Sequence, residues 1–544
     1  MSVTDRQTNP TPVTSDGPID PSQCHLVVVG GGITGLAAAW QATARGVQVS
    51  VVEADDHFGG KLITDERDGF LVEQGPDSFV AYRPAALTLI DELGLSDQVI
   101  SPGGGRRVSL LSRGRLRPMP AGMGMVLPTR MWPFVTTTVL SWADKIRAGF
   151  DLVIPRRLPD HDVAIGAFLR QRLGDGIVRR FADPMVGGIY GAGIDELSLD
   201  AVLPSLRVNE RDYRSLMLAS LASGRAARRR AAQQSSTRGK KTSSPKTSGT
   251  RGPASSPFRT LRGGLGQLIE VLVERLRDGG VELINGTSVD LLGHDGVHLS
   301  DGRILKADAV VLAGGVASSA RLLRPQVPRA ARALDQIPLA STTIVSLAWP
   351  VRAFEAAPDS QGWLEADAGP VSGLTASSIK FAGRAPDGSV LMRVFVPDKR
   401  GPLTDAPDDE LLSAVIDHVR PLLGVHGEPS LTQITRWHKV MPKYTVGHLE
   451  RAAVVDSALT EQRPTWAVAG SALHGVGVPD CISDGRHSAD EVIDAALRAS
   501  VPAGSSRIAA APTAPVAPAR QTTDGRREET LPKDQQPSDP AETR

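Results

Sequence analysis

The stretch LVVVGGGITGLAAAW at residues 26–40 constrains the fold more than any other feature of this chain. A strand-like apolar run meets glycines in the spacing G-x-G-x-x-G and continues into an alanine-rich, helix-like run. The first glycine permits a tight turn, the second lets the backbone approach a pyrophosphate, and the third lets helix and strand pack closely. The helix N-terminus also offers free N–H groups to phosphates, so the pattern predicts a dinucleotide site. Its expected contacts are Gly30, Gly31, Gly32, Ile33, Thr34 and Gly35.

An acidic residue follows this turn at the distance that a ribose requires. After Gly46 a second strand-like run, VQVSVVE, ends at Glu53, about 20 residues beyond the turn, where a carboxylate can accept hydrogen bonds from ribose hydroxyls. A carboxylate at this place disfavours the 2′-phosphate of NADP. FAD and NAD both remain open at this point, as does a glycine turn with a purely structural role.

Strand-like and helix-like runs alternate along the chain, which is typical of an α/β fold. The runs most similar to the first strand are far apart, so we expect one dinucleotide-binding domain assembled from residues 23–80, 258–335 and 440–498. Two insertions, residues 81–224 and 336–439, are expected to form a second domain. The expected strands are Leu26–Val29, Val47–Glu53, Val281–Ile284, Ala309–Leu312, Thr343–Ala348 and Ala467–Ala469. The expected helices are Gly35–Ala44, Pro84–Leu93, Asp144–Leu152, Val163–Leu173, Leu265–Leu276, Asp408–Leu423 and His487–Ala499.

Three segments lack the large apolar side chains that a folded core needs. They are a leader at residues 1–22, a basic insertion at 225–257 and a tail at 499–544. We expect all three to be disordered, because such stretches cannot bury enough apolar surface to offset their ordering entropy. The basic insertion could touch anionic lipid or RNA, although a solvated loop is the simpler interpretation.

The composition excludes several classes of protein. The 544 residues include 61 Lys and Arg against 60 Asp and Glu, so no global field favours nucleic acid as a partner. Two cysteines, Cys24 and Cys481, make neither a disulfide framework nor a zinc cluster, so we expect no metal and a reducing cytoplasm. The sequence has no signal-peptide pattern and no apolar run of about 18 residues. We therefore expect no spanning helix, and only peripheral membrane contact stays open.

Segments beyond the first turn resemble FAD-binding oxidoreductases of the glutathione-reductase-like type. In ADDHFGGKLITDERDGFLVEQGPDSF the glycine pair after the acid is similar to the place where such chains run past the pyrophosphate. DAVVLAGGV at 308–316 resembles a strand that returns to the dinucleotide domain, and TWAVAGSALHGVGVPDCISDGRHSADEV resembles the closing motif beside the flavin ring. The resemblance implies FAD. It also implies further cofactor contacts from Ala54, Gly60, Lys61, Gly75, Pro76, Asp77, Ser78, Val289, Ser471, Val476, Gly477 and Val478.

Three motifs together resemble the protoporphyrinogen/coproporphyrinogen oxidase family: GPDSF at 75–79, MPKYTVGHL at 441–449 and GVGVPDCISDGR at 475–486. The resemblance covers most of residues 25–498. It implies a Rossmann FAD-binding domain with an inserted α+β substrate domain, the architecture of monoamine and protoporphyrinogen oxidases. PMPAGMGMVLPT at 118–129 and GLTASSIKF at 373–381 look more like the soluble Gram-positive branch, whose substrate is coproporphyrinogen III.

The resemblance also implies a reaction in haem biosynthesis. Family members oxidise a porphyrinogen in three two-electron steps, passing hydride to the flavin N5 and reducing oxygen to peroxide. The flavin carries the chemistry, so we expect no catalytic side chain, a neutral His474 without an orienting partner, and a buried rather than flavin-linked Cys481. Arg83 and Lys380 are the expected cations for substrate propionates. A ferrochelatase-type protein is the expected pathway partner.

Three alternatives stay open. A protoporphyrinogen IX oxidase differs only in the side groups of its substrate. A flavin amine oxidase or carotenoid desaturase shares the fold, but amine oxidases usually frame the flavin with aromatic side chains, whereas this chain is 4% aromatic. A flavin-less binding protein, as in the prenyl-GTPase dissociation inhibitors, would predict decay of the phosphate turn or of the closing motif, and both are intact.

Overall fold

A parallel five-stranded sheet carries the glycine turn at the carboxyl end of its central strand. The computed structural model describes residues 20–103, 108–238 and 256–499. The strand order is β10-β2-β1-β14-β20, and every neighbouring pair is parallel. These strands are β1 (His25–Val29), β2 (Gln48–Val52), β10 (Glu282–Ile284), β14 (Ala309–Leu312) and β20 (Trp466–Val468). The expected strands of this sheet are therefore confirmed, although they come from distant parts of the sequence.

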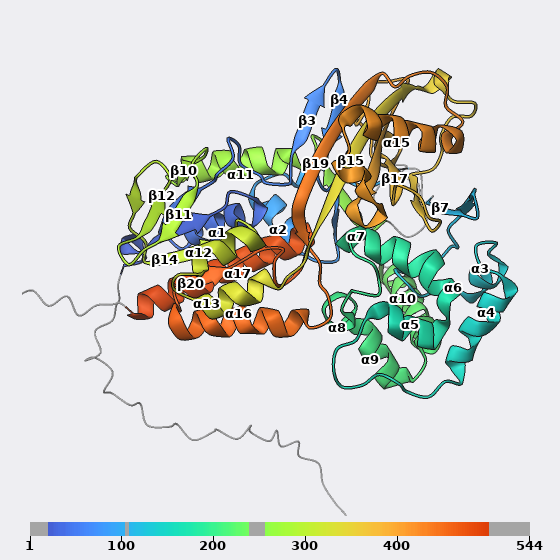
Figure 1. Ribbon diagram of the computed structural model, residues 1–544, viewed down its shortest axis with the longest axis horizontal. Coiled ribbons are helices and arrows are strands. Elements are labelled where there is room, and N and C mark those ends of the chain that lie inside the picture. The colour runs from blue at the N-terminus through green and yellow to red at the C-terminus, as the bar shows by residue number, and fades with distance from the viewer. Residues whose placement is uncertain (1–19, 104–107, 239–255, 500–544) are drawn as a thin grey trace, which may run out of the picture. The chain divides into compact units, whose positions relative to one another are not determined.

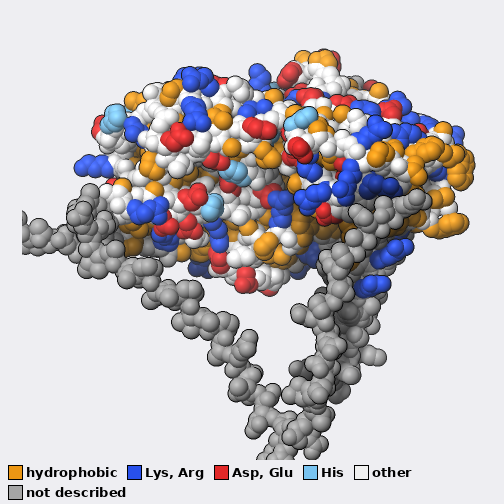
Figure 2. Space-filling model, turned by 90° about the horizontal axis from the view of Figure 1, so that it is seen from below, with side chains coloured by type: hydrophobic (Ala, Val, Ile, Leu, Met, Phe, Trp, Pro, Cys, Tyr) orange, Lys and Arg blue, Asp and Glu red, His pale blue; other side chains and the backbone are white. Residues whose placement is uncertain are grey.

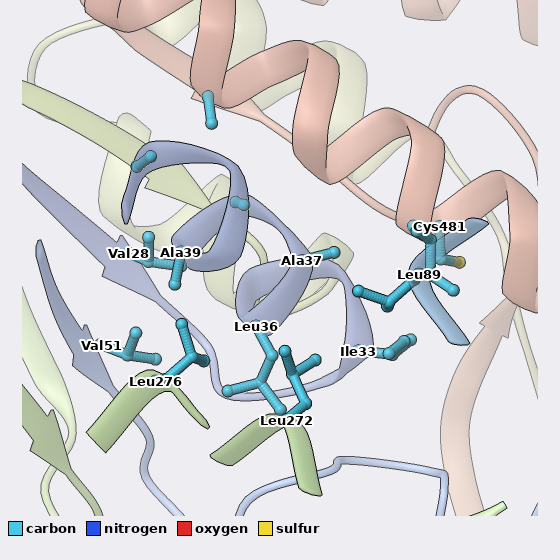
Figure 3. Packing of buried hydrophobic residues seen from close by; sticks show 14 of the residues in the cluster. Val28, Ile33, Leu36, Ala37, Ala39, Val51, Leu89, Leu272, Leu276 and Cys481 are labelled. Atoms are coloured by element: carbon cyan, nitrogen blue, oxygen red, sulfur yellow. The ribbon is translucent and has the colours of Figure 1, made fainter. Parts of the chain in front are cut away.

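Both faces of this sheet are covered, which explains why its strands are apolar throughout. Leu26 and Val28 of β1 pack with one layer, while Val27 and Val29 pack with the other. Figure 3 shows Leu36 and Ala39 between Val28 and the side chains of Leu272 and Leu276. The first layer contains α1 (Ile33–Ala44), α2 (Ala85–Glu92), α11 (Gly266–Asp278) and α17 (Val478–Ala499). The second contains α12 (Val316–Leu323), α13 (Pro328–Asp335), α16 (His448–Gln462) and the sheet of β11 (Val289–Leu292), β12 (Val297–Leu299) and β13 (Ile304–Leu305).

A mixed seven-stranded sheet forms a second layered region, with the order β19-β15-β18-β17-β16-β7-β8. Alternate apolar side chains of β15 and β18, among them Val345, Leu347 and Val394, pack under helix α15 (Asp408–Leu423). The upper right of Figure 1 shows α15 lying over these strands. The strands are β7 (Ser109–Ser112), β8 (Arg115–Pro118), β15 (Leu339–Pro350), β16 (Gly362–Glu365), β17 (Gly373–Ala376), β18 (Ser389–Pro397) and β19 (Leu431–Pro442).

Short strands lie between the two large sheets. The hairpin of β3 (Thr64–Arg67) and β4 (Phe70–Glu73) follows the glycine turn, and β9 (Phe258–Leu261) pairs with both β5 (Phe79–Val80) and β6 (Val99–Ile100). The short helix α14 (Ser377–Lys380) continues from β17.

A helical region occupies most of residues 131–238. It has its own apolar core, which includes Phe168, Leu169, Phe181 and Leu197. A π-helical segment, η4 (Val178–Gly187), contains Pro184, whose missing N–H interrupts regular α-helical bonding. The other elements are α3 (Met131–Thr136), α4 (Trp142–Gly149), η3 (Phe150–Leu152), α5 (Ile165–Leu173), α6 (Asp175–Ile177), α7 (Gly188–Tyr190), α8 (Leu199–Val202), α9 (Pro204–Tyr213) and α10 (Leu216–Arg238).

Two predicted boundaries differ from the structure by more than a few residues. Helix α10 continues to Arg238, so the first part of the expected flexible insertion 225–257 is helical. Its Ala, Arg and Gln residues favour a helix. Residues 239–255 lie outside the described residues, as do nearly all of the leader and the tail. Helix α17 begins at Val478 rather than at His487, since Pro479 in a first turn leaves no hydrogen bond unmade. Among the described helices, none is long and apolar enough to cross a bilayer.

Candidate active site

The glycine turn is tight at two of its glycines and open at the third. Gly30 has φ of +109°, and a Cβ there would lie 2.7 Å from the backbone of Ala313 and Gly314. A Cβ at Gly35 would overlap the carbonyl oxygen of Gly30. A Cβ at Gly32 would have only the Cα of Gly60 nearby, at 3.9 Å. The turn therefore leaves space in front of Gly32 at the N-terminus of α1, where anions are favoured.

Glu53 ties the end of β2 to this turn. Its Oε2 accepts a hydrogen bond from the backbone N–H of Gly31 at 2.6 Å, and its Oε1 accepts one from Asp55 at 2.9 Å. Thr287 donates its N–H to the carbonyl oxygen of Glu53 at 3.0 Å, which brings the loop before β11 to the same edge of the sheet. Val289 begins β11 there, with its carbonyl oxygen accepting from Arg321.

The second glycine pair packs against the first turn. Gly59 donates its N–H to the carbonyl oxygen of Gly31 at 2.9 Å, and Gly32 and Gly59 form an isolated parallel bridge. The exposed Ala54 precedes this pair, and a Cβ at Gly75 would overlap the carbonyl oxygen of Lys61. The structure therefore brings together three glycine segments: the turn 30–35, the pair Gly59–Gly60, and Gly75.

Lys61 is the cationic residue beside these glycine segments. Burial lowers the pKa of its ammonium group from the ordinary value. Among the residues that the structure describes, no carboxylate forms an ion pair with it. A partly buried ammonium group without a carboxylate, beside an open glycine turn at a helix N-terminus, fits the pyrophosphate of a dinucleotide.

The closing motif crosses the start of α1 at Thr34. A Cβ at Gly470 would lie 2.9 Å from the Thr34 hydroxyl oxygen, and a Cβ at Gly485 would overlap the Thr34 carbonyl oxygen. Such backbone contact explains both glycines, because no larger residue fits at a helix crossing this close. Cys481 lies at the same crossing, as Figure 3 shows, and burial raises the pKa of its thiol to about 11. Cys481 is thus a buried, protonated thiol, as predicted.

Tyr444 and His448 hold the loop of the closing motif, and no role was predicted for either. The Tyr444 hydroxyl donates to the carbonyl oxygen of Ser471 at 3.0 Å and accepts from the N–H of Gly475 at 2.7 Å. The His448 ring stacks on Tyr444 with centroids 3.7 Å apart, and its Nε2 lies 2.9 Å from the carbonyl oxygen of Leu473. Both residues belong to the motif MPKYTVGHL. Within it, a Tyr and a His four residues apart were the sequence signal that could have indicated this role.

The loop leads directly into α17. Val476 and Gly477 precede the helix, Val478 begins it, and the Gly477 N–H donates to the carboxylate of Asp480 at 3.2 Å. Asp484, one turn further, accepts from the N–H of Gly470 at 2.6 Å. Asp480 and Asp484 thus satisfy backbone donors on both sides of the loop.

The expectation of a neutral His474 without an orienting partner is wrong. Its Nδ1 lies 2.8 Å from Asp484 Oδ1, and its Nε2 lies 3.2 Å from Asp456 Oδ2. Hydrogen bonds to these two carboxylates raise the pKa of His474 to about 10. Asp456 lies on α16 and Asp484 on α17, so the His474 side chain is oriented by carboxylates from two different helices. His474 is an imidazolium bridge between two helices.

Asp77 and Ser78 receive an unexpected cation. The ammonium group of Lys380 lies 2.8 Å from Asp77 Oδ1 and 3.1 Å from the Ser78 hydroxyl. Arg393 of β18 contributes a second positive charge, with its Nη1 3.8 Å from Asp77 and its Nη2 donating to the carbonyl oxygen of Gly75. These cations lower the pKa of Asp77 well below the usual range despite its burial. Lys380 is therefore committed to an internal carboxylate, which replaces the predicted contact with substrate.

Arg83 lies close to the closing motif. Its guanidinium pairs with the carboxylate of Asp480 at the start of α17, and half of its side chain remains exposed. Pro76 lies on the same loop, between Asp77 and Gly75, and Gly75 packs against the backbone of Lys61. Arg83 is thus the predicted substrate cation that retains an accessible face.

The assembled site can bind a dinucleotide but offers little acid–base or nucleophilic chemistry of its own. Within the described ranges, no three His, Cys, Asp or Glu side chains are grouped to hold a metal ion. Cys481 is protonated, and His474 is held between two carboxylates. The open glycine turn suits dinucleotide binding better than nucleophilic catalysis. So does Lys61, which has no carboxylate partner among the described residues.

Comparison with known proteins agrees with this geometry. Residues 33–493 match the family described as flavin containing amine oxidoreductase. The chain is 84% identical to the coproporphyrinogen III oxidase of Propionibacterium freudenreichii over 94% of its length and 99% of that relative. It is 31% identical to the coproporphyrinogen III oxidase of Bacillus subtilis over 86% of its length and 98% of that relative.

Solved structures show the same architecture. A crystal structure described as a protoporphyrinogen oxidase from Exiguobacterium matches with a TM-score of 0.73 and 28% identity, over 87% of this chain and 99% of that one. A UDP-galactopyranose mutase matches with a TM-score of 0.62 and 17% identity, over 87% and 96%, which is a likeness of fold alone. The predicted α/β fold class is confirmed. The chain belongs to the flavin containing amine oxidoreductases and, within them, to the protoporphyrinogen/coproporphyrinogen oxidase family.

Proposed function

We propose that this protein is an FAD-dependent oxidase that converts coproporphyrinogen III to coproporphyrin III. The observation that carries the proposal is the 84% identity to a coproporphyrinogen III oxidase, which extends over nearly the whole of both chains. Molecular oxygen is the proposed electron acceptor, with release of hydrogen peroxide.

FAD is the proposed flavin because the residues fit each part of the dinucleotide. The N-terminus of α1, the open side of Gly32 and the Lys61 ammonium group suit the pyrophosphate. Glu53, whose Oε2 accepts from Gly31 of the turn and whose Oε1 accepts from Asp55, suits the adenosine ribose. Bound flavin would supply an acceptor for hydride from the porphyrinogen, which no side chain of this protein offers.

The closing motif would hold the reactive end of the cofactor. Tyr444 and His448 fix the loop 471–475 through three hydrogen bonds, and the neutral Tyr444 hydroxyl, whose pKa burial raises, keeps its proton throughout the ordinary pH range. A loop fixed in this way can set the distance between flavin and substrate without solvent reorganisation.

The proposed division into domains follows from these cofactor contacts. We propose that residues 23–80, 258–335 and 440–498 bind the flavin and that residues 81–224 and 336–439 receive the macrocycle. Arg83 stands at the junction, half exposed beside α17, and is the proposed contact for a propionate. Lys380 instead positions the loop of Asp77.

The proposed setting is the cytoplasm, with peripheral contact to a membrane and a ferrochelatase-type enzyme as the pathway partner. A ferrochelatase is the class of enzyme that would follow, because a metal must be inserted into the porphyrin that this reaction makes.

The test is anaerobic mixing of the purified protein with coproporphyrinogen III under a visible spectrometer. Each flavin accepts two of the six electrons, so the proposal expects the flavin band to bleach on mixing, and a porphyrin Soret band and peroxide to appear once oxygen is admitted. A colourless protein, or a flavin band that persists, would overturn it.

Protoporphyrinogen IX is the substrate to compare. A spinach relative at 28% identity is named protoporphyrinogen oxidase, which makes this alternative specific. The proposal expects a higher kcat/KM for coproporphyrinogen III. A reversed preference would assign the chain to the alternative, while oxidation of amines without either porphyrinogen would point to an amine oxidase.

A further inference from the structure

Asp480, in the first turn of α17, packs against two glycines of the closing loop. Its carboxylate accepts a hydrogen bond from the N–H of Gly477 at 3.2 Å. A Cβ at Gly477 would lie 2.8 Å from Asp480 Oδ2, and a Cβ at Gly475 would lie 2.7 Å from the Cβ of Asp480. A shift of this side chain therefore shifts the loop, because close-packed neighbours transmit strain.

Arg83 joins this carboxylate to the helical region. Its guanidinium pairs with Asp480, and 50% of the Arg83 side chain is exposed against 15% of Asp480. A guanidinium group has five N–H donors, so one edge can hold Asp480 while another stays free for a second carboxylate. Burial raises the pKa of Tyr190 at the end of α7, and the charge of Arg83 opposes this rise. The Tyr190 and Tyr444 rings lie 5.7 Å apart, so Arg83 lies where the helical region meets the closing motif.

The neighbouring acidic side chains already have other partners. A groove between α16 and α17 is lined in part by Asp456, His474, Asp480 and Asp484. Figure 2 shows His, Asp and Glu side chains close together on the face seen from below, the side on which Figure 1 draws α16. His474 lies between Asp456 and Asp484, whereas Arg83 is the one cation that forms an ion pair with Asp480 among the described residues. The orientations of Arg83 and Asp480 therefore depend on each other.

We propose that Asp480 is a positioning residue that links substrate binding to the closing loop through Arg83. A propionate on the free edge of Arg83 would be connected to Gly475 and Gly477 by one guanidinium and one carboxylate. The macrocycle would then be held at a fixed place relative to the loop that is proposed to hold the reactive end of the cofactor. Such geometry matters, since a misplacement of about 1 Å can slow a reaction about 100-fold.

This inference rests on the proposed function, because it takes Arg83 as the contact for a propionate and the loop as part of the flavin site. The two proposals fail in different ways. A parent protein that does not oxidise coproporphyrinogen III refutes the function. An active parent protein in which Arg83 and Asp480 act independently refutes the inference alone.

Two simpler roles for Asp480 predict different results. If the carboxylate only competes with a propionate for Arg83, removing its charge should tighten the binding of a porphyrin. If it only supports the loop, removing its charge should slow the reaction to the same extent whether or not Arg83 is present.

The decisive variant is Asp480→Asn. The amide oxygen of Asn can still accept from Gly477, and the side chain keeps nearly the same shape beside Gly475, so the variant should fold and keep its flavin. It loses the charge that orients Arg83. The companion variants are Arg83→Gln and the double variant R83Q/D480N. The matched control, R324Q/D335N, removes an exposed pair of the same kind between the end of α12 and α13.

Two measurements separate binding from the chemical step. Fluorescence anisotropy of coproporphyrin III gives the Kd of the flavin-loaded protein, and anaerobic stopped-flow mixing with saturating coproporphyrinogen III gives the limiting rate at which the flavin band bleaches. Arg83→Gln should raise the Kd at least about tenfold, because it loses a charge-assisted hydrogen bond, and should slow bleaching about tenfold. Asp480→Asn should slow bleaching about tenfold and leave the Kd within about threefold of the parent.

The double variant tests the link itself. It should bleach no more slowly than Arg83→Gln, because Asp480 then has no cation to orient, and residues that act as a unit are not additive. A further slowing in the double variant would show that Asp480 acts on the loop alone and would overturn the inference. So would tighter binding of coproporphyrin III by Asp480→Asn, or a parental bleaching rate in that variant. R324Q/D335N should match the parent in both measurements.

Discussion

The ammonium group of Lys380 lies 2.8 Å and 2.9 Å from the two carboxylate oxygens of Asp77, across 303 residues of sequence. Both side chains are nearly buried, at 15% and 12% exposure. The pair joins the loop after β4 to helix α14 at the edge of the seven-stranded sheet, and Arg393 adds a fully buried cation on the sheet side. This connection couples the glycine-turn segments to the second layered region.

Removing the carboxylate should therefore be costly. Asp77→Asn leaves Lys380 and Arg393 without their counter-charge, and uncompensated buried charge costs about 3–5 kcal/mol in free energy of unfolding. Because the folded-state pKa of Asp77 lies below its ordinary value of 3.8, this stability is present above that pH and is lost only as the pH falls below it. Denaturant titration at neutral pH measures the effect. The control, Asp301→Asn, breaks an exposed pair with Arg303 and should cost far less; equal losses would contradict the prediction.

The second and third glycines of the turn, Gly32 and Gly35, should respond differently to one added methyl group. Gly35→Ala places its Cβ on the Gly30 carbonyl oxygen and should yield a protein that is strongly destabilised or insoluble. Gly32→Ala meets only Gly60, at 3.9 Å, so the apoprotein should fold normally while flavin affinity falls, because the methyl group occupies the proposed phosphate space. Circular dichroism and flavin titration separate the two outcomes. Normal flavin affinity in Gly32→Ala would place the pyrophosphate elsewhere.

His474 should give the protein a characteristic dependence on alkaline pH. Its folded-state pKa of about 10 lies above the ordinary 6.5, so its stabilisation is fully present below pH 6.5 and is lost as the pH rises through about 10. Thermal midpoints of the parent and of His474→Gln should differ most near pH 6 and converge by about pH 10. The control is His487→Gln, whose exposed side chain pairs with Glu491 one turn away. A constant difference across this range would show that His474 is neutral.

Tyr444→Phe should loosen the loop of the closing motif without emptying the core. The substitution leaves the Gly475 N–H and the Ser471 carbonyl oxygen without their partner, which costs about 1–3 kcal/mol. We expect kcat with coproporphyrinogen III to fall more than KM rises, because the loop acts on the geometry of the flavin rather than on substrate capture. Steady-state kinetics and thermal unfolding measure both effects, with Tyr213→Phe on the exposed end of α9 as the control. An unchanged kcat would remove Tyr444 from the positioning of this loop.

Local patterns predicted the parallel sheet and the cofactor turn, but they missed much of the second layered region, including β18 and β19. Strand β14 and helix α15 have the bounds that their apolar periodicity indicated. Spacing alone predicted that Glu53 lies beside the turn, and its carboxylate accepts a hydrogen bond from the N–H of Gly31. These features depend on residues within about 20 positions of one another, where the covalent chain limits the conformations that compete.

The errors share a different cause. Lys380 was expected at a substrate propionate, but it pairs with Asp77, 303 residues away in the sequence. His474 was expected to be neutral, but it lies between Asp456 and Asp484, and no motif indicated that these carboxylates face its ring. Helix α10 continues beyond its apolar residues to Arg238, since Ala and Arg favour a helix. Tyr444 carried a visible motif, but its hydrogen bonds to Ser471 and Gly475 depend on how α16 meets the closing loop.

By itself the sequence determined that this chain has a βαβ dinucleotide turn, an α/β fold and a family resemblance, because glycine spacing and apolar periodicity act through steric rules over short distances. Only the tertiary structure decided which charges neutralise one another and which remain available. Ion pairing and desolvation depend on distances in space. Folding brings Asp77 to Lys380, brings Asp456 to His474, turns Trp142 outward and, among the described residues, leaves Lys61 without a carboxylate partner.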